Sequence, residues 1–339
     1  MNKTDARGSG SPRLLGATRI SITSNGARFF SSQRFAPAHR GYATLMIRRP
    51  ESQFEETVNT LSRLTYFQRR ILARNGGPKI TKDRFLYKYR ALNPESAESV
   101  SQMRDLIVLS KFWLSSASDF NDPFDGLGNF FADGSVQEKR ARLESLLKIQ
   151  GLNWSQRQRR LSQLASRPNS YYEDEVRKFY ALYYPKVGIC CFAGDPRNIL
   201  MWSHYANNHK GVWLQLESAR DPKTFSQTIS MSYSEEYPRV NWINGFYDGL
   251  KILMQRKHRG WCYERETRIR MLDSARTYRS FNPEALRAIC FGCRASAQTI
   301  SKIKELVKER IDRGLPRLTL YQAKLHSSKY RLAVCRFVD

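Results

Sequence analysis

The chain has 339 residues, enough for one large domain or two ordinary ones and for a core that needs neither disulfides nor metals. Hydrophobic residues make up 41% of it, which excludes wholesale disorder, and no apolar run of about 18 residues predicts a transmembrane helix. The 57 Lys and Arg outnumber the 31 Asp and Glu, for a formal net charge of +26. This surplus favours polyanionic partners, namely nucleic acid, an anionic membrane or phosphate-bearing small molecules.

Residues 1–50 form a basic segment in which Asp5 is the one acid, and they are rich in Ser, Thr, Gly and Ala. This composition is typical of a disordered tail and also of a mitochondrial presequence. Met46 is an alternative translation start. We expect a cytoplasmic protein if the segment is a tail or is untranslated, and a mitochondrial one if residues 1–45 are a presequence.

Residues 51–80 are predicted to form a helical lead-in that ends at a Gly-Gly-Pro break. We expect the rest, 81–339, to be a single α+β domain. It opens with a strand at 85–90 and a helix that has Asn93 as its N-cap and Pro94 at its first position. Short strands at 106–109 and 112–115 and a turn at 119–126 are expected next. Residues 137–184 are predicted to be a basic helical insertion.

The second half of the chain continues with short elements. The expected strands are 187–192, 212–216, 229–233, 261–271, 286–291, 317–323 and 330–338, and the expected helices are 198–207, 245–257 and 297–312. Because strands and helices do not alternate regularly, the fold class is α+β rather than doubly wound α/β. The P-loop and the GxGxxG fingerprint are both absent, which argues against a Walker-type nucleotidase or a Rossmann dehydrogenase.

The six cysteines are predicted to be free thiols in a reducing compartment, because they are sparse and lie in apolar, strand-like segments. They are Cys190, Cys191, Cys262, Cys290, Cys293 and Cys335. Cys290 and Cys293 have the spacing of half a zinc site, but no second pair accompanies them, so we expect no metal there.

The segment Trp261–Arg268 carries the most informative pattern. On a strand, alternate residues share a face, so Glu264, Glu266 and Arg268 would point the same way. An opposite charge lowers a carboxylate pKa and a second carboxylate raises one, so this arrangement could separate the roles of two acids. The alternative is a solvated edge strand with ion pairs.

Two other segments could contribute to a site. In the loop around Asn121, Asp122 and Asp125, the neighbouring Phe120 and Phe124 are expected to anchor the acids on the core, although the same residues suit an ordinary turn. In the segment 201–212, helical spacing places Trp202 and Tyr205 on one face, where either could stack on a planar ring. Core packing is the alternative for these aromatics, and metal ligation is the alternative for His204 and His209.

Read in order, the motifs LYKYR, FNDPFD, MWSHYA with HKGV, and WCYERETR resemble a widespread, mainly bacterial domain-of-unknown-function family, over residues 85–335. The opening strand–helix–strand and the late Glu-x-Glu also resemble the ADP-ribosyltransferase fold. This second resemblance implies a split core of mixed and antiparallel sheets with peripheral helices. It also implies NAD as substrate and a macromolecular acceptor, nucleic acid or protein, in a defence or toxin setting.

The same resemblance assigns roles to residues of this chain. Glu266 is the implied catalytic acid and Glu264 positions the acceptor, with no metal. The implied NAD-binding residues are Lys88, Tyr89, Arg90, Trp202, His204, Tyr205 and Arg268.

Two other functions remain open at this level. In a phosphodiesterase or nuclease, Mg²⁺ or Mn²⁺ would be bound by Asp122, Asp125, Glu264, Glu266 and His204. In a non-catalytic nucleic-acid-binding module, basic helices between residues 140 and 167 would contact phosphates while aromatic side chains stack on bases.

Overall fold

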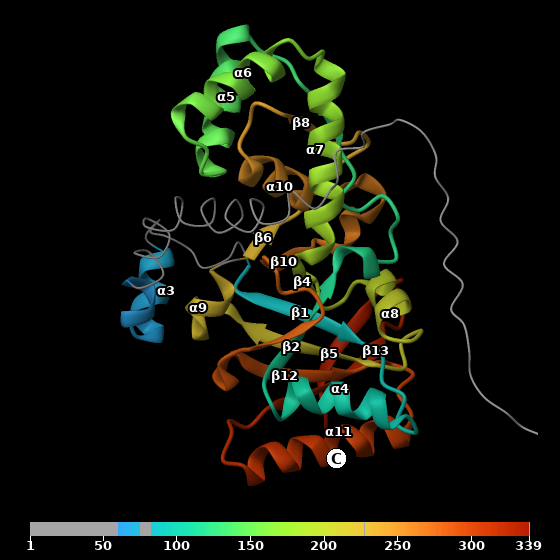
Figure 1. Cartoon of the computed structure of the whole chain (residues 1–339). Coiled ribbons are helices and arrows are strands. Elements are labelled where there is room, and N and C mark those ends of the chain that lie inside the picture. Colours follow the sequence, from blue (N-terminus) through green and yellow to red (C-terminus); the bar gives the residue numbers. More distant parts are fainter. Residues whose placement is uncertain (1–59, 75–82, 227, 339) are drawn as a thin grey trace, which may run out of the picture.

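The computed structural model describes residues 60–74, 83–226 and 228–338, and it shows an α+β fold with two five-stranded sheets (Figure 1). The predictions for residues 1–50 lie outside the described residues. From the predicted lead-in, helix α3 (Tyr66–Arg74) is described. It is tied to the sheets by the Tyr66 hydroxyl, which donates to Glu217 over 2.5 Å.

The first sheet has the order β1-β5-β12-β13-β14. Its strands are β1 (Phe85–Arg90), β5 (Val212–Glu217), β12 (Leu286–Phe291), β13 (Thr319–Leu325) and β14 (Leu332–Arg336). The β12–β13 pair is parallel and the other pairs are antiparallel. The sheet is therefore mixed.

The second sheet has the order β11-β2-β4-β10-β6 and is antiparallel. Its strands are β2 (Lys111–Ser116), β4 (Gly188–Phe192), β6 (Thr228–Ser230), β10 (Thr267–Met271) and β11 (Thr277–Ser280). A bridge between Tyr87 of β1 and Ala193, directly after β4, joins it to the first sheet. The two sheets therefore meet at β1 and β4.

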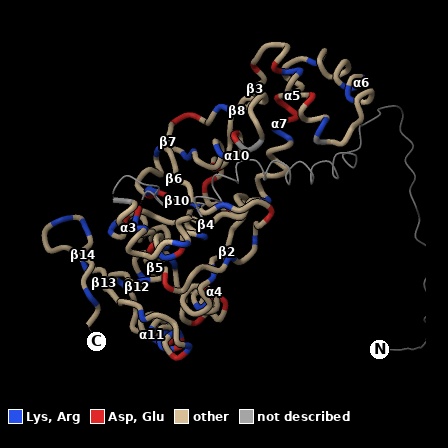
Figure 2. Tube along the Cα trace, turned by 90° about the vertical axis from the view of Figure 1, so that its left-hand side faces the viewer, with Lys and Arg blue, Asp and Glu red and all other residues tan. Residues whose placement is uncertain are grey.

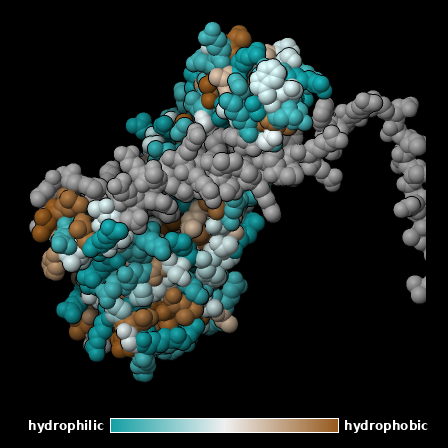
Figure 3. All heavy atoms as spheres, turned by 60° about the vertical axis from the view of Figure 1, so that its left-hand side comes forward, coloured by the Kyte–Doolittle hydropathy of each residue, from teal (hydrophilic) through white to brown (hydrophobic). Residues whose placement is uncertain are grey.

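The remaining elements surround the sheets. The helices are α4 (Ala97–Ile107), α5 (Val136–Ile149), α6 (Trp154–Ala165), α7 (Asn169–Tyr183), α8 (Ile199–Tyr205), α9 (Pro222–Phe225), α10 (Phe246–Gln255) and α11 (Ala297–Asp312), with short 3₁₀ turns η2 (Ala117–Asp119), η3 (Tyr184–Lys186), η4 (Ser218–Arg220), η5 (Arg259–Glu264) and η6 (Pro283–Ala285). Two parallel strand pairs complete the fold, β3 (Asn129–Phe131) with β8 (Arg239–Asn241) and β7 (Ser232–Ser234) with β9 (Arg256–His258). Helices α5 and α6 lie at one end of the molecule, away from the sheets (Figure 1), and their surface in Figure 3 is mostly hydrophilic.

One apolar core holds both sheets and helices α4 and α11 together. At its centre the Phe112 ring stacks on Phe281 with a centroid distance of 4.2 Å and meets Phe192 and Phe225 edge-on. Phe112 is completely buried. Because β2 alternates buried and more exposed residues, the face opposite Phe112 is left for the cavity described below.

The sequence predictions were wrong in two segments of the fold. The expected strand at 106–109 begins as the last turn of α4, whose N-cap is Ser96 rather than Asn93. This apolar run belongs to the buried side of a helix. A short apolar run fits a buried strand equally well, so the sequence pattern could not decide between the two. The expected strand at 261–271 begins only at Thr267, because 259–264 form the 3₁₀ turn η5 and Arg265 has a left-handed backbone with φ 45°.

Arg310 of α11 is a fully buried cation that binds three backbone carbonyls, those of Ile107, Pro283 and Pro316, at 2.6–2.8 Å. Replacing Arg310 with Met would keep an unbranched apolar side chain there but remove the donor from the Ile107 and Pro316 carbonyls, so we expect the free energy of unfolding to fall by about 3 kcal/mol. Urea unfolding measures the change. Arg313→Met, at an exposed position of the same helix end, is the control, and an equal loss in both variants would contradict this account.

Candidate active site

A cavity of about 740 Å³ opens between β1, β2, β4 and helices α4 and α8. Strand alternation directs Lys88 and Arg90 of β1 into it, and likewise Lys111, Trp113 and Ser115 of β2. The inner wall is formed by residues from four separate segments, namely Asn121, Asp125, Cys191, His204, Tyr205, Lys257, Glu264, Glu266 and Arg268.

A buried network of charges lies at the inner end of the cavity. Lys257 Nζ lies 2.7 Å from Glu264 Oε2 and 3.2 Å from Glu266 Oε2. Arg268 Nε donates to Glu266 Oε1 over 2.7 Å, and its two terminal nitrogens bind both oxygens of Asp125. All five side chains are at most 5% exposed. The network therefore holds three carboxylates and two cations away from water.

The backbone explains how residues so close in sequence come to face one another. Lys257 lies on β9, and η5 followed by the left-handed turn at Arg265 turns the chain back, so that Glu264 and Glu266 both reach Lys257. The Glu266 amide donates to the Tyr233 hydroxyl over 2.8 Å, which fixes the start of β10. The predicted convergence of the acids is present, but a turn rather than a strand produces it.

The two glutamates have oppositely shifted pKa values. Burial would raise the pKa of Glu266, but Arg268 and Lys257 outweigh this effect and lower it to about 2. Burial raises the pKa of Glu264, the negative charge of Glu266 adds to the rise, and Lys257 opposes it. The network thus favours the ionised form of Glu266, whereas burial and the Glu266 charge make Glu264 the easier of the two to protonate.

Helix α8 supplies the residue that contacts Glu264 from across the cavity. The Tyr205 hydroxyl donates to Glu264 Oε1 over 2.7 Å. Burial and the neighbouring Glu264 raise the pKa of Tyr205, so it stays a proton donor. His204, exposed on the same helix, lines the cavity beside it. Each Glu264 oxygen therefore has one hydrogen-bond donor.

Two of the predicted NAD-binding aromatics are core residues. Trp202 is fully buried and its indole donates to the Pro196 carbonyl over 3.2 Å. Tyr89 packs edge-on against Trp202, and its hydroxyl donates to the Asp195 carbonyl over 2.7 Å. Trp202 therefore has no exposed face that a ligand could contact. Tyr89 is 6% exposed, so only a small part of its side chain lines the cavity.

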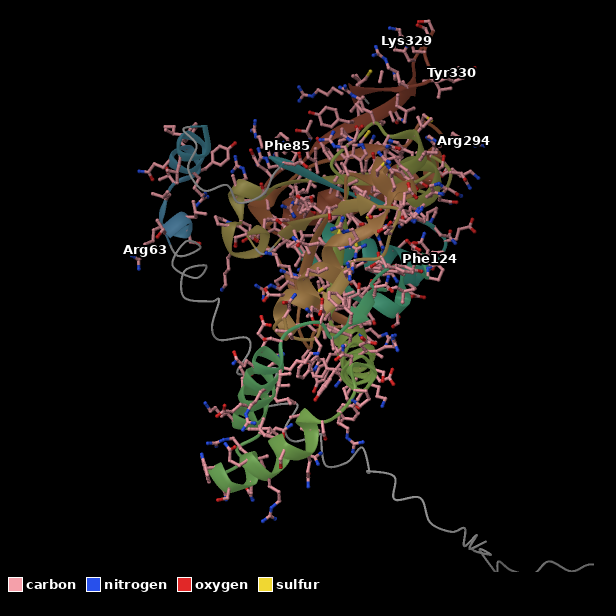
Figure 4. All side chains as sticks on the ribbon, turned by 90° about the horizontal axis from the view of Figure 1, so that it is seen from above. Arg63, Phe85, Phe124, Arg294, Lys329 and Tyr330 are labelled. Carbon is pink, nitrogen blue, oxygen red and sulfur yellow. The ribbon has the colours of Figure 1, made fainter. Side chains whose placement is uncertain are left out.

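Of the two aspartates in the predicted acidic loop, one belongs to the site and the other does not. Asp125 joins the buried network, whereas Asp122 is buried outside the cavity lining and accepts from the Phe124 amide at 3.0 Å. The expectation that Phe124 anchors the loop was wrong, because it is 59% exposed and points outward in Figure 4. Phe120 is the anchor, with its ring 5.1 Å from the Arg268 guanidinium.

The basic residues of β1 bind to neutral groups. Lys88 Nζ donates to the Cys191 carbonyl over 3.2 Å. Arg90 donates to Gln102 Oε1 over 2.8 Å, its Nε is buried without a hydrogen-bond partner, and burial lowers its pKa. Among the described residues neither cation forms an ion pair with a carboxylate. β1 therefore contributes two cations without carboxylate partners to the cavity lining.

Sequence reasoning missed Lys257, Trp113 and Tyr278. Lys257 stands in the basic run from Arg256 to Arg259, and nothing in that run marks it as the buried member. Basic residues recur along much of the Cα trace in the view of Figure 2, so charge alone does not locate the cavity. All six cysteines are free, as predicted.

The comparisons with known proteins cover part of this site. Residues 201–269 match the model of a family described as "protein of unknown function (DUF2971)", which agrees with the expected kind of family. The matched segment contains Tyr205, Lys257, Glu264, Glu266 and Arg268 but not β1. No curated protein and no solved structure matches the chain. Over the described ranges, no helix has the length and apolar character needed to cross a membrane.

Replacing Arg268 with Met would leave the carboxylates of Asp125 and Glu266 buried and would remove the guanidinium that neutralises much of their negative charge. We expect the free energy of unfolding at pH 7 to fall by about 3–5 kcal/mol. The exposed Arg276, paired with Asp119, gives the control variant Arg276→Met.

The Arg268→Met loss is expected to shrink in acid. Glu266, with its pKa lowered from 4.5 to about 2, stabilises the wild type above pH 4.5 and loses that contribution as the pH falls towards 2. In the variant the buried acids bind protons more readily and become neutral. Urea unfolding at pH 7 and pH 3.5 measures both effects, and a deficit that does not change with pH would contradict the charge network as its cause.

Proposed function

We propose that this protein is an ADP-ribosyltransferase-like enzyme that consumes NAD and modifies a macromolecule. The observation that carries the proposal is the pair Glu264 and Glu266, whose pKa values are shifted in opposite directions at the inner end of a cavity that β1 lines with the cations Lys88 and Arg90. Two titratable groups separated in this way are typical of an acid–base site. The split arrangement of two sheets around the cavity is consistent with the resemblance of the motifs.

The contacts favour Glu264 rather than Glu266 as the reacting carboxylate. Both oxygens of Glu266 are held by Arg268 and one also by Lys257, so it serves as a fixed negative charge. Such a charge would stabilise the oxocarbenium-like transition state in which the C1′–nitrogen bond of NAD breaks and its electron pair leaves with nicotinamide. The acceptor then bonds to C1′, and Glu264 takes the proton that the acceptor loses.

The cations of β1 suit the other part of the substrate. Lys88 and Arg90 lie in the wall without carboxylate partners, and a pyrophosphate would supply the missing charge-assisted bonds. Tyr205 and the exposed His204 are the side chains next to Glu264 that could contact nicotinamide.

The metal-dependent nuclease is supported less well. Within the described part of the chain, no group of three or more His, Cys, Asp or Glu side chains is placed to hold a metal ion. The network acids are instead bound to Lys257 and Arg268, and a divalent ion would have to displace these cations. The basic helices α5 and α6 keep the nucleic-acid-binding module as a second candidate.

The proposal is tested by nicotinamide release from NAD by the full chain, with and without RNA, DNA and cell protein. We expect nicotinamide release by the wild type, and at least about a hundredfold slower transfer of ADP-ribose to the acceptor in Glu264→Gln, which lacks the base for the acceptor's proton. Glu284→Gln, an exposed acid outside the cavity, should keep full activity. Wild-type protein that releases no nicotinamide under any condition would overturn the proposal.

Tyr205→Phe tests the role of Glu264 through pH. The Tyr205 hydrogen bond lowers the pKa of Glu264, against the larger effect of burial. Without this hydrogen bond the pKa of Glu264 should rise further, so the acid limb of the rate–pH profile should move to higher pH. The rate of the variant should therefore fall less at alkaline pH than at acid pH. An acid limb that stays in place would exclude Glu264 as the titrating base.

A further inference from the structure

The outer half of the cavity is bounded by two exposed aromatic side chains that the proposed chemistry does not use. Trp113 of β2 and Tyr278 of β11 face each other in register, with ring centroids 5.0 Å apart. They are 42% and 49% exposed, yet both line the cavity. A cross-strand aromatic pair stabilises a sheet edge, but that role does not require both rings to border a cavity.

Polar groups of α4 and β1 lie beside this pair. The face of α4 that lines the cavity carries Glu98, Gln102 and Asp105, which are three or four residues apart. Glu98 accepts from Gln102 Nε2 over 3.1 Å, and Gln102 Oε1 accepts from Arg90 over 2.8 Å. A hydrogen bond to Asp105 raises the pKa of Tyr278. The aromatic rings, the carboxylates and the Arg90 cation therefore share one wall.

We propose that this outer half is a nucleoside-binding subsite. The base would stack on Trp113 beside Tyr278, the ribose hydroxyls would donate to Asp105 or Glu98, and a phosphate on the same nucleoside would reach Arg90. An exposed indole recognises a planar ring, and carboxylates recognise a diol. A guanidinium without an acidic partner recognises an anion. Only the choice of NAD as one source of the nucleoside rests on the proposed function.

Two ligands could supply this nucleoside. One is the adenosine half of NAD, which would span the cavity from Trp113 to Glu264. The other is a nucleotide of a nucleic-acid acceptor, held next to the reacting acids. Both present the same chemistry to the wall, so the experiment must distinguish them.

The direct test is calorimetric titration of the full chain with AMP and with ribose 5-phosphate, which lacks the base. We expect AMP to bind more tightly, Trp113→Ala to weaken AMP binding about tenfold, and Trp113→Phe to retain most of it. Binding of ribose 5-phosphate should not change in these variants. Trp154→Ala is the matched control, because Trp154 is 67% exposed on α6 and lies outside the cavity.

The subsite would be overturned if AMP bound no better than ribose 5-phosphate. It would also be overturned if Trp113→Ala kept its fold by circular dichroism and bound AMP like the wild type. The same proteins are assayed with NAD and with a short single-stranded oligonucleotide. A higher KM for NAD at unchanged kcat in Trp113→Ala identifies the adenosine half as the source. Weaker oligonucleotide binding with an unchanged KM identifies the acceptor nucleotide.

The two proposals fail separately. If NAD is not cleaved but AMP binding depends on Trp113, the subsite stands and the transferase falls. If NAD is cleaved and AMP binding does not depend on Trp113, the transferase stands and the subsite falls.

Discussion

The buried guanidinium of Arg268 is the interaction on which the site depends. It binds Asp125, which follows η2 in a loop, and Glu266, which directly precedes β10, so it joins two segments more than a hundred residues apart in sequence. A guanidinium remains charged when buried and presents donors in a fixed plane, so it can hold two carboxylates at once. Without that charge, Asp125 would lose its cationic partner and Glu266 would keep only Lys257.

This fixed charge accounts for the asymmetry of the two glutamates. Glu266 is held ionised by Arg268 and Lys257, and its negative charge then adds to the effect of burial on Glu264. Lys257 contacts both acids and prevents their repulsion from opening the turn between them. The same contacts therefore stabilise the turn and determine which acid can exchange protons.

The separation of the sheets gives the cavity its two halves. β1 and β4 touch at the Tyr87–Ala193 bridge, and next to it Lys88 of β1 reaches the Cys191 carbonyl of β4 in the cavity lining. The acids and Tyr205 lie at the inner end, and Trp113 and Tyr278 at the outer end, with Lys88 and Arg90 along the wall from β1. A cavity lined in this order would suit a ligand with a reacting bond at one end and an aromatic ring at the other.

Much of the secondary structure could be read from the sequence, since strands at 85–90, 187–192, 212–216 and 286–291 follow from apolar patterning. The α4 boundary could not, because the run Leu106–Leu109 fits the buried side of a helix as well as a strand. The turn at η5 was also missed. Its left-handed residue is Arg265, a residue type that gives no turn signal.

The sequence by itself determined the α+β fold class and the basic character of the chain, and it predicted that Glu264, Glu266 and Arg268 come together. These depend on composition, local periodicity and nearby residues. Tertiary structure alone decided that Lys257 and Asp125 complete the charge network, that Trp202 belongs to the core, and that Trp113 and Tyr278 border the cavity. Burial and long-range pairing determine those outcomes, and neither is encoded in the spacing of residues along the chain.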